Sequence, residues 1–310
     1  MRIVFLGTPD FAVKPLESII ENGYNVVAAI TNPDKPVGRK QTITACPVKE
    51  TALRHGIPVY QYTKIRNEGV EDLKALKPDL MVTCAFGQIL SQEILDIPTI
   101  GTINIHASLL PKYRGSSPIQ WAIINGEKVT GITIMFTDVG VDTGDIILQD
   151  ELQIEDTDTA GTLFYKLSVL GSKSVIKALE SIETGTYTRT KQDETKATHT
   201  KFFNKESGLL NFNKTADEIV NLVRGLNPWP VAYFMYKGEK IQVYSAENKN
   251  SDYNEESGTV VSADKKNGLI VNVNGGSVRL KTLKKSGGKL MPDTDFLNGN
   301  RILPGEKLFK

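Results

Sequence analysis

The 310-residue chain has few of the residues that build zinc sites and disulfide frameworks, namely two cysteines and three histidines. Cys46 and Cys84 lie far apart in the sequence, and neither belongs to a CxxC pair. This pattern indicates neither kind of site, and unpaired thiols suit a reducing compartment. We therefore expect a cytoplasmic protein that binds no metal.

Long hydrophobic runs are missing as well. Residues 1–10 (MRIVFLGTPD) are apolar over only a few positions, which predicts a first buried strand rather than a signal peptide. No apolar run approaches the roughly 20 residues that a membrane-spanning helix requires. The composition, 40% hydrophobic and 24% charged, is instead typical of a soluble globular protein.

Two catalytic signatures are also absent. The chain has no GxSxG motif, which argues against a hydrolase with a nucleophile elbow. Its first loop, GTPDFA at residues 7–12, has the first glycine of GxGxxG but neither of the other two. Pro9 and Phe11 would also crowd the approach of a pyrophosphate. A nicotinamide-dependent oxidoreductase is therefore disfavoured.

Charge is unevenly distributed, although the net charge is only +1. Residues 1–204 carry 21 Lys and Arg against 24 Asp and Glu, whereas residues 205–310 carry 16 against 12. From Lys265 onward there are 10 basic and 3 acidic residues. A basic C-terminal part indicates either a polyanion-binding end or a lysine-rich solvated surface, and composition alone leaves both open.

The first two hundred residues alternate short apolar runs with stretches of helical periodicity. Runs such as VVAAI and LMVTCAF are apolar throughout, as in a sheet that is covered on both faces. The alternation predicts an α/β fold with a doubly wound, mostly parallel, Rossmann-like sheet. The expected strands are residues 2–7, 25–31, 57–62, 79–86 and 101–107, and the expected helices are 11–23, 47–56, 69–78 and 91–98.

The second half predicts a change of architecture. Residues 129–137 and 144–154 suggest two more strands, and 159–182 a long amphipathic helix. The polar residues 185–207 are expected to link a first domain, 1–184, to a second, 208–310. After a helix at 215–226, short strands alternate with Gly and Asn turns, which predicts a small OB-like β-barrel.

The stretch NIHASLLPKYRGSSPIQ (104–120) places an amide and an imidazole two residues apart. On a strand at 101–107, Asn104 and His106 point to one face, and Ile103 and Ile105 point to the other. Both polar side chains then lie near the C-terminal end of the strand, where open α/β sheets bind ligands. A structural histidine beside an asparagine is the alternative interpretation.

The Gly-rich loop at residues 137–146 (TDVGVDTGDI) offers three carboxylates, Asp138, Asp142 and Asp145. Aspartates in such loops are usually turn formers, but one beside an imidazole stabilises its charged form and fixes its orientation. An amide N–H and an imidazolium stabilise an oxyanion, and a carboxylate helps to take a proton from an attacking amine. The group suits acyl transfer to an amine without a covalent enzyme intermediate.

Motifs spread over nearly the whole chain give a family resemblance. They resemble those of the 10-formyltetrahydrofolate-dependent formyltransferases, and VDTGDI is specific to that fold. GTPDFAV and DFLNG narrow the resemblance to the branch that acts on tRNA. The motifs are MRIVFLGTPDFAV (1–13), NPDKPVGR (32–39), AFGQIL (85–90), NIHASLLPKYRGSSPIQWAI (104–123), GITIMFTDVGVDTGDI (131–146), GLNPWPVA (225–232) and GGKLMPDTDFLNG (287–299).

The resemblance implies site residues at matching positions. Its three catalytic residues fall on Asn104, His106 and Asp142. The co-substrate it implies is 10-formyltetrahydrofolate, with no metal. The folate site would comprise the turn after the histidine at 108–112, the strand-end segment 85–90 and the loop around 139–142. Its residues would be Ser108, Leu109, Leu110, Pro111, Lys112, Phe86, Gly87 and Val139.

The acceptor implied by the resemblance is the α-amino group of methionine esterified to the initiator tRNA, and the product serves translation initiation. Phe11 would lie against the methionine side chain, and Arg39 would touch the acceptor end of the tRNA. Lys284 and Lys285 would contact phosphates without reading bases. The family's basic loop usually continues with glycine and lysine after the arginine, whereas this chain has QTIT at 41–44.

Two other functions remain open. A formyltransferase acting on a small amine, such as glycinamide ribonucleotide or an amino sugar, would share the chemistry but give no role to a basic second domain. A non-catalytic tRNA-binding protein would have lost one of the three catalytic residues, and all three are present. Nothing in the sequence calls for an oligomer, so we expect a monomer.

Overall fold

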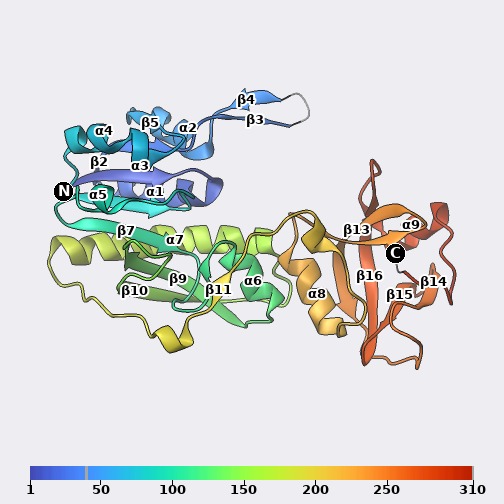
Figure 1. Cartoon of the computed structure of the whole chain (residues 1–310). Coiled ribbons are helices and arrows are strands. Elements are labelled where there is room, and N and C mark those ends of the chain that lie inside the picture. The colour runs from blue at the N-terminus through green and yellow to red at the C-terminus, as the bar shows by residue number, and fades with distance from the viewer. Residues whose placement is uncertain (39–40, 309–310) are drawn as a thin grey trace. The chain divides into compact units, whose positions relative to one another are not determined.

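The computed structural model describes residues 1–38 and 41–308 (Figure 1). The chain divides into two compact units. The first comprises residues 1–118, 129–153 and 164–200, and the second comprises 119–128, 154–163 and 201–310. Two short segments from the middle of the chain, 119–128 and 154–163, therefore belong to the second unit.

The first unit is built on a seven-stranded sheet of order β10-β9-β7-β6-β1-β2-β5. The five strands from β5 to β7 are parallel, whereas β9 and β10 run antiparallel to their neighbours. The predicted doubly wound, mostly parallel sheet is confirmed. Its strands are β1 (Arg2–Gly7), β2 (Asn25–Thr31), β5 (Val59–Gln61), β6 (Leu80–Cys84), β7 (Gly101–His106), β9 (Val129–Phe136) and β10 (Ile146–Gln153).

Helices cover this sheet. Alternate residues of the central strands, such as Val4 and Leu6 of β1, pack in one core with Ile65, Leu73 and Ile94 from three helices. This two-sided burial explains why the strands are apolar throughout. The helices up to residue 183, including those that run through the segments 119–128 and 154–163, are α1 (Val13–Glu21), α2 (Pro47–Arg54), α3 (Ile65–Glu68), α4 (Val70–Leu76), α5 (Gln92–Leu95), α6 (Pro118–Ile124) and α7 (Ala160–Glu183).

Short elements that periodicity did not predict complete the first unit. A hairpin of β3 (Lys35–Val37) and β4 (Thr42–Thr44) follows β2. Two-residue strands, β8 (Arg114–Gly115) and β11 (His199–Thr200), pair in parallel. The pairing fixes part of the polar segment 185–207 to the turn that follows His106. Two short 3-10 turns of this unit lie at Asp10–Ala12 and Glu194–Lys196, and a third, Glu206–Gly208, lies in the second unit.

The second unit is a small antiparallel β domain, as predicted. Its strands follow the order β12-β13-β16-β15-β14, and β17 pairs with β16. Apolar residues of these strands and of the two helices form one core. The elements are α8 (Ala216–Gly225), β12 (Ala232–Tyr236), β13 (Glu239–Asn248), β14 (Val260–Asp264), β15 (Gly268–Val273), β16 (Gly276–Lys285), β17 (Met291–Pro292) and α9 (Asp293–Gly299).

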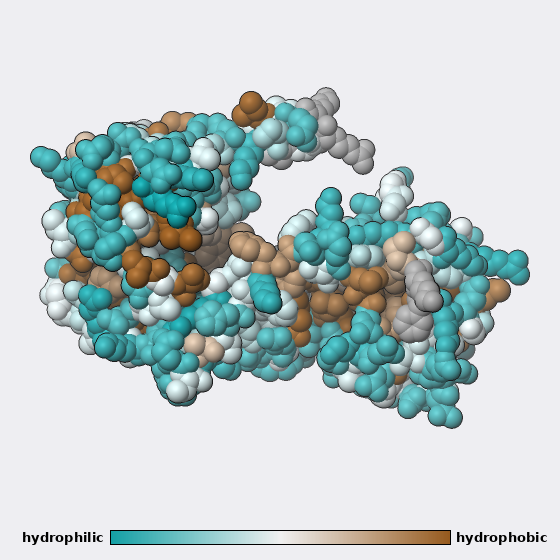
Figure 2. All heavy atoms as spheres, viewed as in Figure 1, coloured by the Kyte–Doolittle hydropathy of each residue, from teal (hydrophilic) through white to brown (hydrophobic). Residues whose placement is uncertain are grey.

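The visible face of each unit is mainly hydrophilic, and hydrophobic residues gather in separate patches (Figure 2). Among the helices of residues 1–38 and 41–308, none combines the length and the apolarity that crossing a bilayer demands.

Helix α8 begins with a capping box. The Thr215 hydroxyl accepts the backbone N–H of Glu218 at 3.3 Å, and the Glu218 carboxylate accepts the backbone N–H of Thr215 at 2.9 Å. Lys214 donates to the other oxygen of Glu218 at 2.9 Å. The bonds from Lys214 and Thr215 lower the pKa of Glu218 to about 2. The cap therefore holds a carboxylate that stays ionised in mild acid.

Thr215→Ala should lower the free energy of unfolding of the second unit by about 1 kcal/mol, because an N-cap hydroxyl satisfies a backbone donor that alanine leaves unpaired. Both tryptophans, Trp121 and Trp229, lie in this unit, so their fluorescence during urea unfolding follows it. Ser286→Ala, at an exposed position of the same unit, is the control. Equal urea midpoints for the two variants would contradict this role of the cap.

The contribution of Glu218 should depend on pH. Because its folded-state pKa is depressed, its stabilisation is present above the ordinary value of 4.5 and is lost as the pH falls toward 2. Wild type should therefore be more stable than Glu218→Gln at pH 7, and the difference should shrink below pH 4.5. Urea titrations at several pH values measure it, and a pH-independent difference would count against the assigned bonds.

Candidate active site

Asn104 and His106 lie two residues apart on β7, on the face of the sheet opposite Ile105. Ile105 faces α7, where a Cβ on Gly171 would come within 3.3 Å of its side chain. The predicted alternation along this strand is therefore confirmed. Asn104 is next to Thr83 of β6 in the parallel register. The Thr83 hydroxyl donates to Asn104 Oδ1 at 2.8 Å, which turns the amide nitrogen of Asn104 away from β6.

The imidazole of His106 is buried, and both of its nitrogens face protein oxygen atoms. Nε2 is 3.0 Å from the backbone oxygen of Tyr113. A carbonyl can only accept, so Nε2 carries a hydrogen. Nδ1 is 3.5 Å from Asp142 Oδ2. The backbone carbonyl of Tyr113, seven residues further along the chain, thus orients the ring so that Nδ1 faces the carboxylate of Asp142.

Asp142 reaches this position from the loop between β9 and β10. Its backbone is left-handed, with a φ of 54°, which costs most L-residues roughly 1 kcal/mol or more. Its Oδ2 accepts the backbone N–H of Gly115 at 2.7 Å, and its Oδ1 is 3.4 Å from Asn104 Nδ2. Two residues later the loop passes so close to β9 that a Cβ on Gly144 would lie 1.8 Å from the Phe136 oxygen. Only glycine fits that position.

The three side chains converge, but they do not bond tightly to one another. Each is held by a short bond to a group outside the cluster: Asn104 by Thr83, His106 by Tyr113 and Asp142 by Gly115. The distances between them, 3.4 and 3.5 Å, exceed the usual 2.9–3.0 Å of such a bond. These long contacts can be exchanged for closer bonds to a reacting oxygen or nitrogen atom.

The turn at 108–112, which follows His106 directly, is fixed by buried hydrogen bonds. Ser108 is fully buried, and its hydroxyl donates to the Lys112 oxygen at 2.7 Å. The hydroxyl of Thr133 in β9 donates to the Ser108 oxygen at 2.6 Å and accepts the Leu110 N–H at 3.1 Å. Leu110 is buried, Leu109 and Pro111 are half-buried, and Lys112 is exposed. The turn is rigid where it adjoins the cluster.

The segment 85–90, which leaves the end of β6, is fixed in a similar way. Asn32 donates to the Phe86 oxygen at 2.9 Å and accepts from Gln88 at 2.7 Å. The ring of Phe86 is 4% exposed and packs in the core of the first unit, so this residue presents only its backbone. Gly87 is exposed.

Three apolar side chains of these segments face solvent: Ile89, Val139 and Val141 are 68%, 65% and 58% exposed. Ile89 belongs to the segment 85–90, and Val139 and Val141 belong to the loop that carries Asp142.

The remaining predicted residues are dispersed. Phe11 is 4% exposed and packs edge-on against Phe164, with ring centroids 5.2 Å apart. Arg39 lies outside the described residues. Lys284 and Lys285 occupy adjacent positions of β16 in the second unit, where both are half-buried and Lys285 forms an ion pair with Glu239 at 2.5 Å.

Sequence reasoning missed the groups that orient the cluster. The carbonyl of Tyr113 and the N–H of Gly115 are backbone groups, which leave no side-chain signature. Thr83 lies within an apolar strand, which gives it no signal of a role in the site. Gln192 bonds to the backbone of the Asp142 loop, and Arg114 bonds to Gln192. In the sequence, the one signal for Arg114 is its position as a basic residue directly after the turn.

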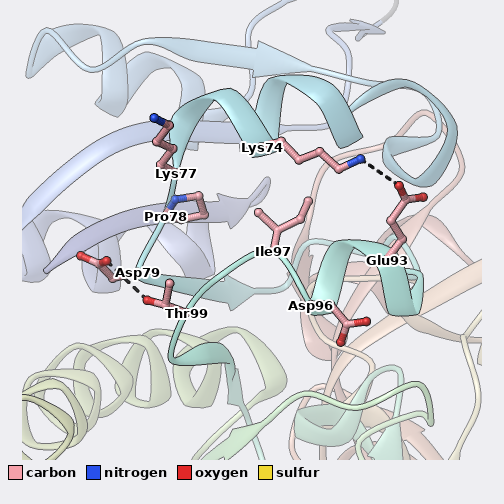
Figure 3. Close-up of a pocket in the computed structure, with 8 residues that line it drawn as sticks. All are labelled: Lys74, Lys77, Pro78, Asp79, Glu93, Asp96, Ile97 and Thr99. Carbon is pink, nitrogen blue, oxygen red and sulfur yellow. Dashed lines mark hydrogen bonds and ion pairs between the residues drawn. The ribbon is translucent and has the colours of Figure 1, made fainter.

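A separate hollow of about 590 Å³ lies at the N-terminal ends of β6 and β7, opposite the strand ends that carry the cluster (Figure 3). Asp79 and Thr99, which precede β6 and β7, face each other there, and Lys74 pairs with Glu93 across it. It contains none of the converging side chains, so its size does not make it the site of chemistry. Within residues 1–38 and 41–308, no group of three or more potential metal ligands occurs.

The fold has known counterparts. The solved structure of WlaRD, a sugar 3N-formyl transferase studied with dTDP and 5-N-formyl-THF, superposes with a TM-score of 0.67 at 22% identity. The match covers 92% of this chain and 97% of that one. HypX from Aquifex aeolicus, in complex with tetrahydrofolic acid, gives 0.64 at 17% identity over 96% of this chain and 47% of that one. At these identities the likeness shows the fold.

Sequence comparison covers both units. The Formyl transferase family matches residues 1–179, and the Formyl transferase C-terminal domain matches residues 203–301. A methionyl-tRNA formyltransferase of Ruminiclostridium cellulolyticum is 46% identical over 100% of both chains. A protein of the same name from Bacillus subtilis is 46% identical over 99% of this chain and 97% of that protein. The chain therefore belongs to the formyl transferase family of enzymes.

Proposed function

We propose that this chain transfers the formyl group of 10-formyltetrahydrofolate to the α-amino group of methionyl-tRNA, the initiator tRNA charged with methionine. The product is N-formylmethionyl-tRNA for translation initiation. The observation that carries the chemistry is the convergence of Asn104, His106 and Asp142 across gaps of 3.4 and 3.5 Å. The acceptor is inferred from the relatives that are 46% identical over essentially the whole chain.

The three residues have distinct roles in the proposed reaction. Asn104 Nδ2 and the Nδ1–H of His106 in its imidazolium form stabilise the oxyanion that forms when the amine attacks the formyl carbon. Asp142 keeps the imidazole oriented and assists removal of the proton from the attacking nitrogen. A carbon–nitrogen bond forms to the amine, the bond to N10 of the folate breaks, and N10 takes up the proton.

The folate site proposed here follows the edge of the first unit next to the cluster. The turn of Ser108, Leu109, Leu110, Pro111 and Lys112, which its own hydrogen bonds hold rigid, forms a wall of this site beside His106. The backbone of Phe86 and Gly87 supplies a polar edge. Exposed Val139, together with Ile89 and Val141, fits the need of a flat pterin ring for apolar surface.

For the tRNA, we propose that domain 208–310 binds phosphates, with residues 185–207 as the link from domain 1–184. Lys284 and Lys285 are assigned to phosphate contacts, Arg39 to the acceptor end and Phe11 to the methionine side chain. The excess of basic residues after Lys265 supports the first assignment. The neighbours that act on sugars show that the fold alone does not fix the acceptor.

The decisive experiment measures formyl transfer from 10-formyltetrahydrofolate to charged initiator tRNA, with free methionine, glycinamide ribonucleotide and an amino sugar nucleotide in parallel. Transfer to the charged tRNA alone is expected. Transfer only to a small amine would overturn the acceptor and keep the chemistry, whereas no transfer by the folded protein would leave a tRNA-binding role.

Substituting the cluster should abolish most turnover without unfolding the protein. His106→Ala and Asp142→Asn are each expected to lower kcat by about 100-fold or more, since acid–base and oxyanion groups contribute on that scale. His55→Ala, at an exposed position after α2, is the control and should keep full activity. Near wild-type kcat in either cluster variant would remove the proposed mechanism.

Replacing Lys284 and Lys285 together by glutamine should weaken tRNA binding and reduce its dependence on salt. For each phosphate that is no longer neutralised, the slope of log K against log salt falls by about one unit. The control is the double variant Lys265→Gln and Lys266→Gln, which lies on the exposed turn after β14. The control should keep the wild-type slope. A wild-type slope for the Lys284 and Lys285 variant as well would show that these two lysines do not bind the tRNA.

A further inference from the structure

The segment 189–194, part of the polar stretch expected to link the two domains, packs along the loop that carries Asp142. Thr190 exchanges two backbone hydrogen bonds with Ile146, of 2.8 and 2.9 Å. The guanidinium of Arg189 pairs with Asp145 at 3.0 Å and lies over the ring of Phe136. The loop is therefore fixed at its C-terminal end by this segment.

Gln192 binds the loop at the catalytic aspartate itself. Its amide nitrogen donates to the backbone oxygens of Asp142 and Gly144, both at 2.8 Å. Its amide oxygen accepts from Arg114 Nε at 3.0 Å and Nη2 at 2.8 Å. A carbonyl can only accept and a guanidinium can only donate, so the orientation of the amide is fixed by its partners.

Arg114 connects this amide to the histidine. It is 1% exposed, and its charge is paired with Glu194 through two hydrogen bonds of 2.7 and 2.8 Å. Its neighbours in the chain are Tyr113, whose carbonyl binds His106, and Gly115, whose N–H binds Asp142. A displacement of Arg114 would therefore move the backbone groups that orient both catalytic side chains.

The Asp142 loop needs such support. Asp142 has a left-handed backbone, and the exposed Val139 and Val141 give the loop no core to pack against. We propose that Gln192, held by Arg114, is a positioning residue that keeps the Asp142 carboxylate facing Asn104 and His106. The polar linker then contributes directly to the catalytic geometry. The inference rests on the role of Asp142 under the proposed function.

The test uses Gln192→Glu in the full chain. Glutamate keeps the acceptor for Arg114, so the buried guanidinium stays paired, but it has no donor for the two loop carbonyls. We expect kcat to fall about 10- to 100-fold with an unchanged KM for the charged tRNA, since small misplacements of catalytic groups cost on this scale. Lys191→Glu introduces the same residue at the adjacent exposed position and should leave kcat unchanged.

Two further readouts separate positioning from a general structural role. Hydrogen exchange of the amides at 138–146 should accelerate in Gln192→Glu, whereas exchange in β1 and β6 should not change. In the Asp142→Asn background, Gln192→Glu should cause no further loss of kcat, because it acts through the carboxylate. Unchanged exchange in the loop, or a full additive loss in the double variant, would overturn the positioning role.

The same data distinguish failure of the inference from failure of the proposed function. If Asp142→Asn alone retains activity, the mechanism is wrong. Faster hydrogen exchange of the loop in Gln192→Glu would then still show that Gln192 holds the loop. If Asp142→Asn is inactive and Gln192→Glu has wild-type kcat, the mechanism stands and the positioning role is wrong.

Discussion

The 2.7 Å hydrogen bond from the Gly115 N–H to the carboxylate of Asp142 joins two parts of the chain that the sheet alone would leave separate. One is the turn after β7, and the other is the loop between β9 and β10. Because the donor follows Tyr113, whose carbonyl orients His106, one short piece of backbone fixes an imidazole and a carboxylate together. The relative position of the two side chains thus depends on these backbone groups rather than on the direct contact between His106 Nδ1 and Asp142 Oδ2, which is 3.5 Å long.

The sheet supplies the third member of the cluster. Parallel pairing places Thr83 of β6 directly beside Asn104 of β7, and the threonine hydroxyl decides which end of the amide faces the loop. A slip of one residue in this register would turn Asn104 and His106 toward α7 and bring Ile105 to the site. The buried apolar residues of both strands prevent that slip. The geometry of the cluster therefore depends on the same burial that stabilises the fold.

Sequence patterns predicted the layers better than the connections. Apolar strands and helical spacing predicted the seven main strands of the first unit, because burial on both faces produces a strong compositional signal. Strand β4, whose residues are all exposed, and the four-residue helix α3, which buries only Ile65, gave no such signal. In the site, Asn104, His106 and Asp142 are brought together as expected. Their supporting groups are mostly backbone atoms, whose positions depend on the tertiary structure.

The polar segment 185–207 illustrates a limit of composition as a guide. A flexible linker is polar because it is solvated, but a segment that binds backbone carbonyls and a buried guanidinium must be polar too. Gln192 meets both descriptions, and only its partners, Asp142 O, Gly144 O and Arg114, distinguish them. Buried Arg114 is the more informative residue, because an arginine that is 1% exposed requires acceptors from somewhere in the chain. A basic residue directly after a turn that adjoins a candidate site is thus a reason to search polar linkers for the residues that pair with it.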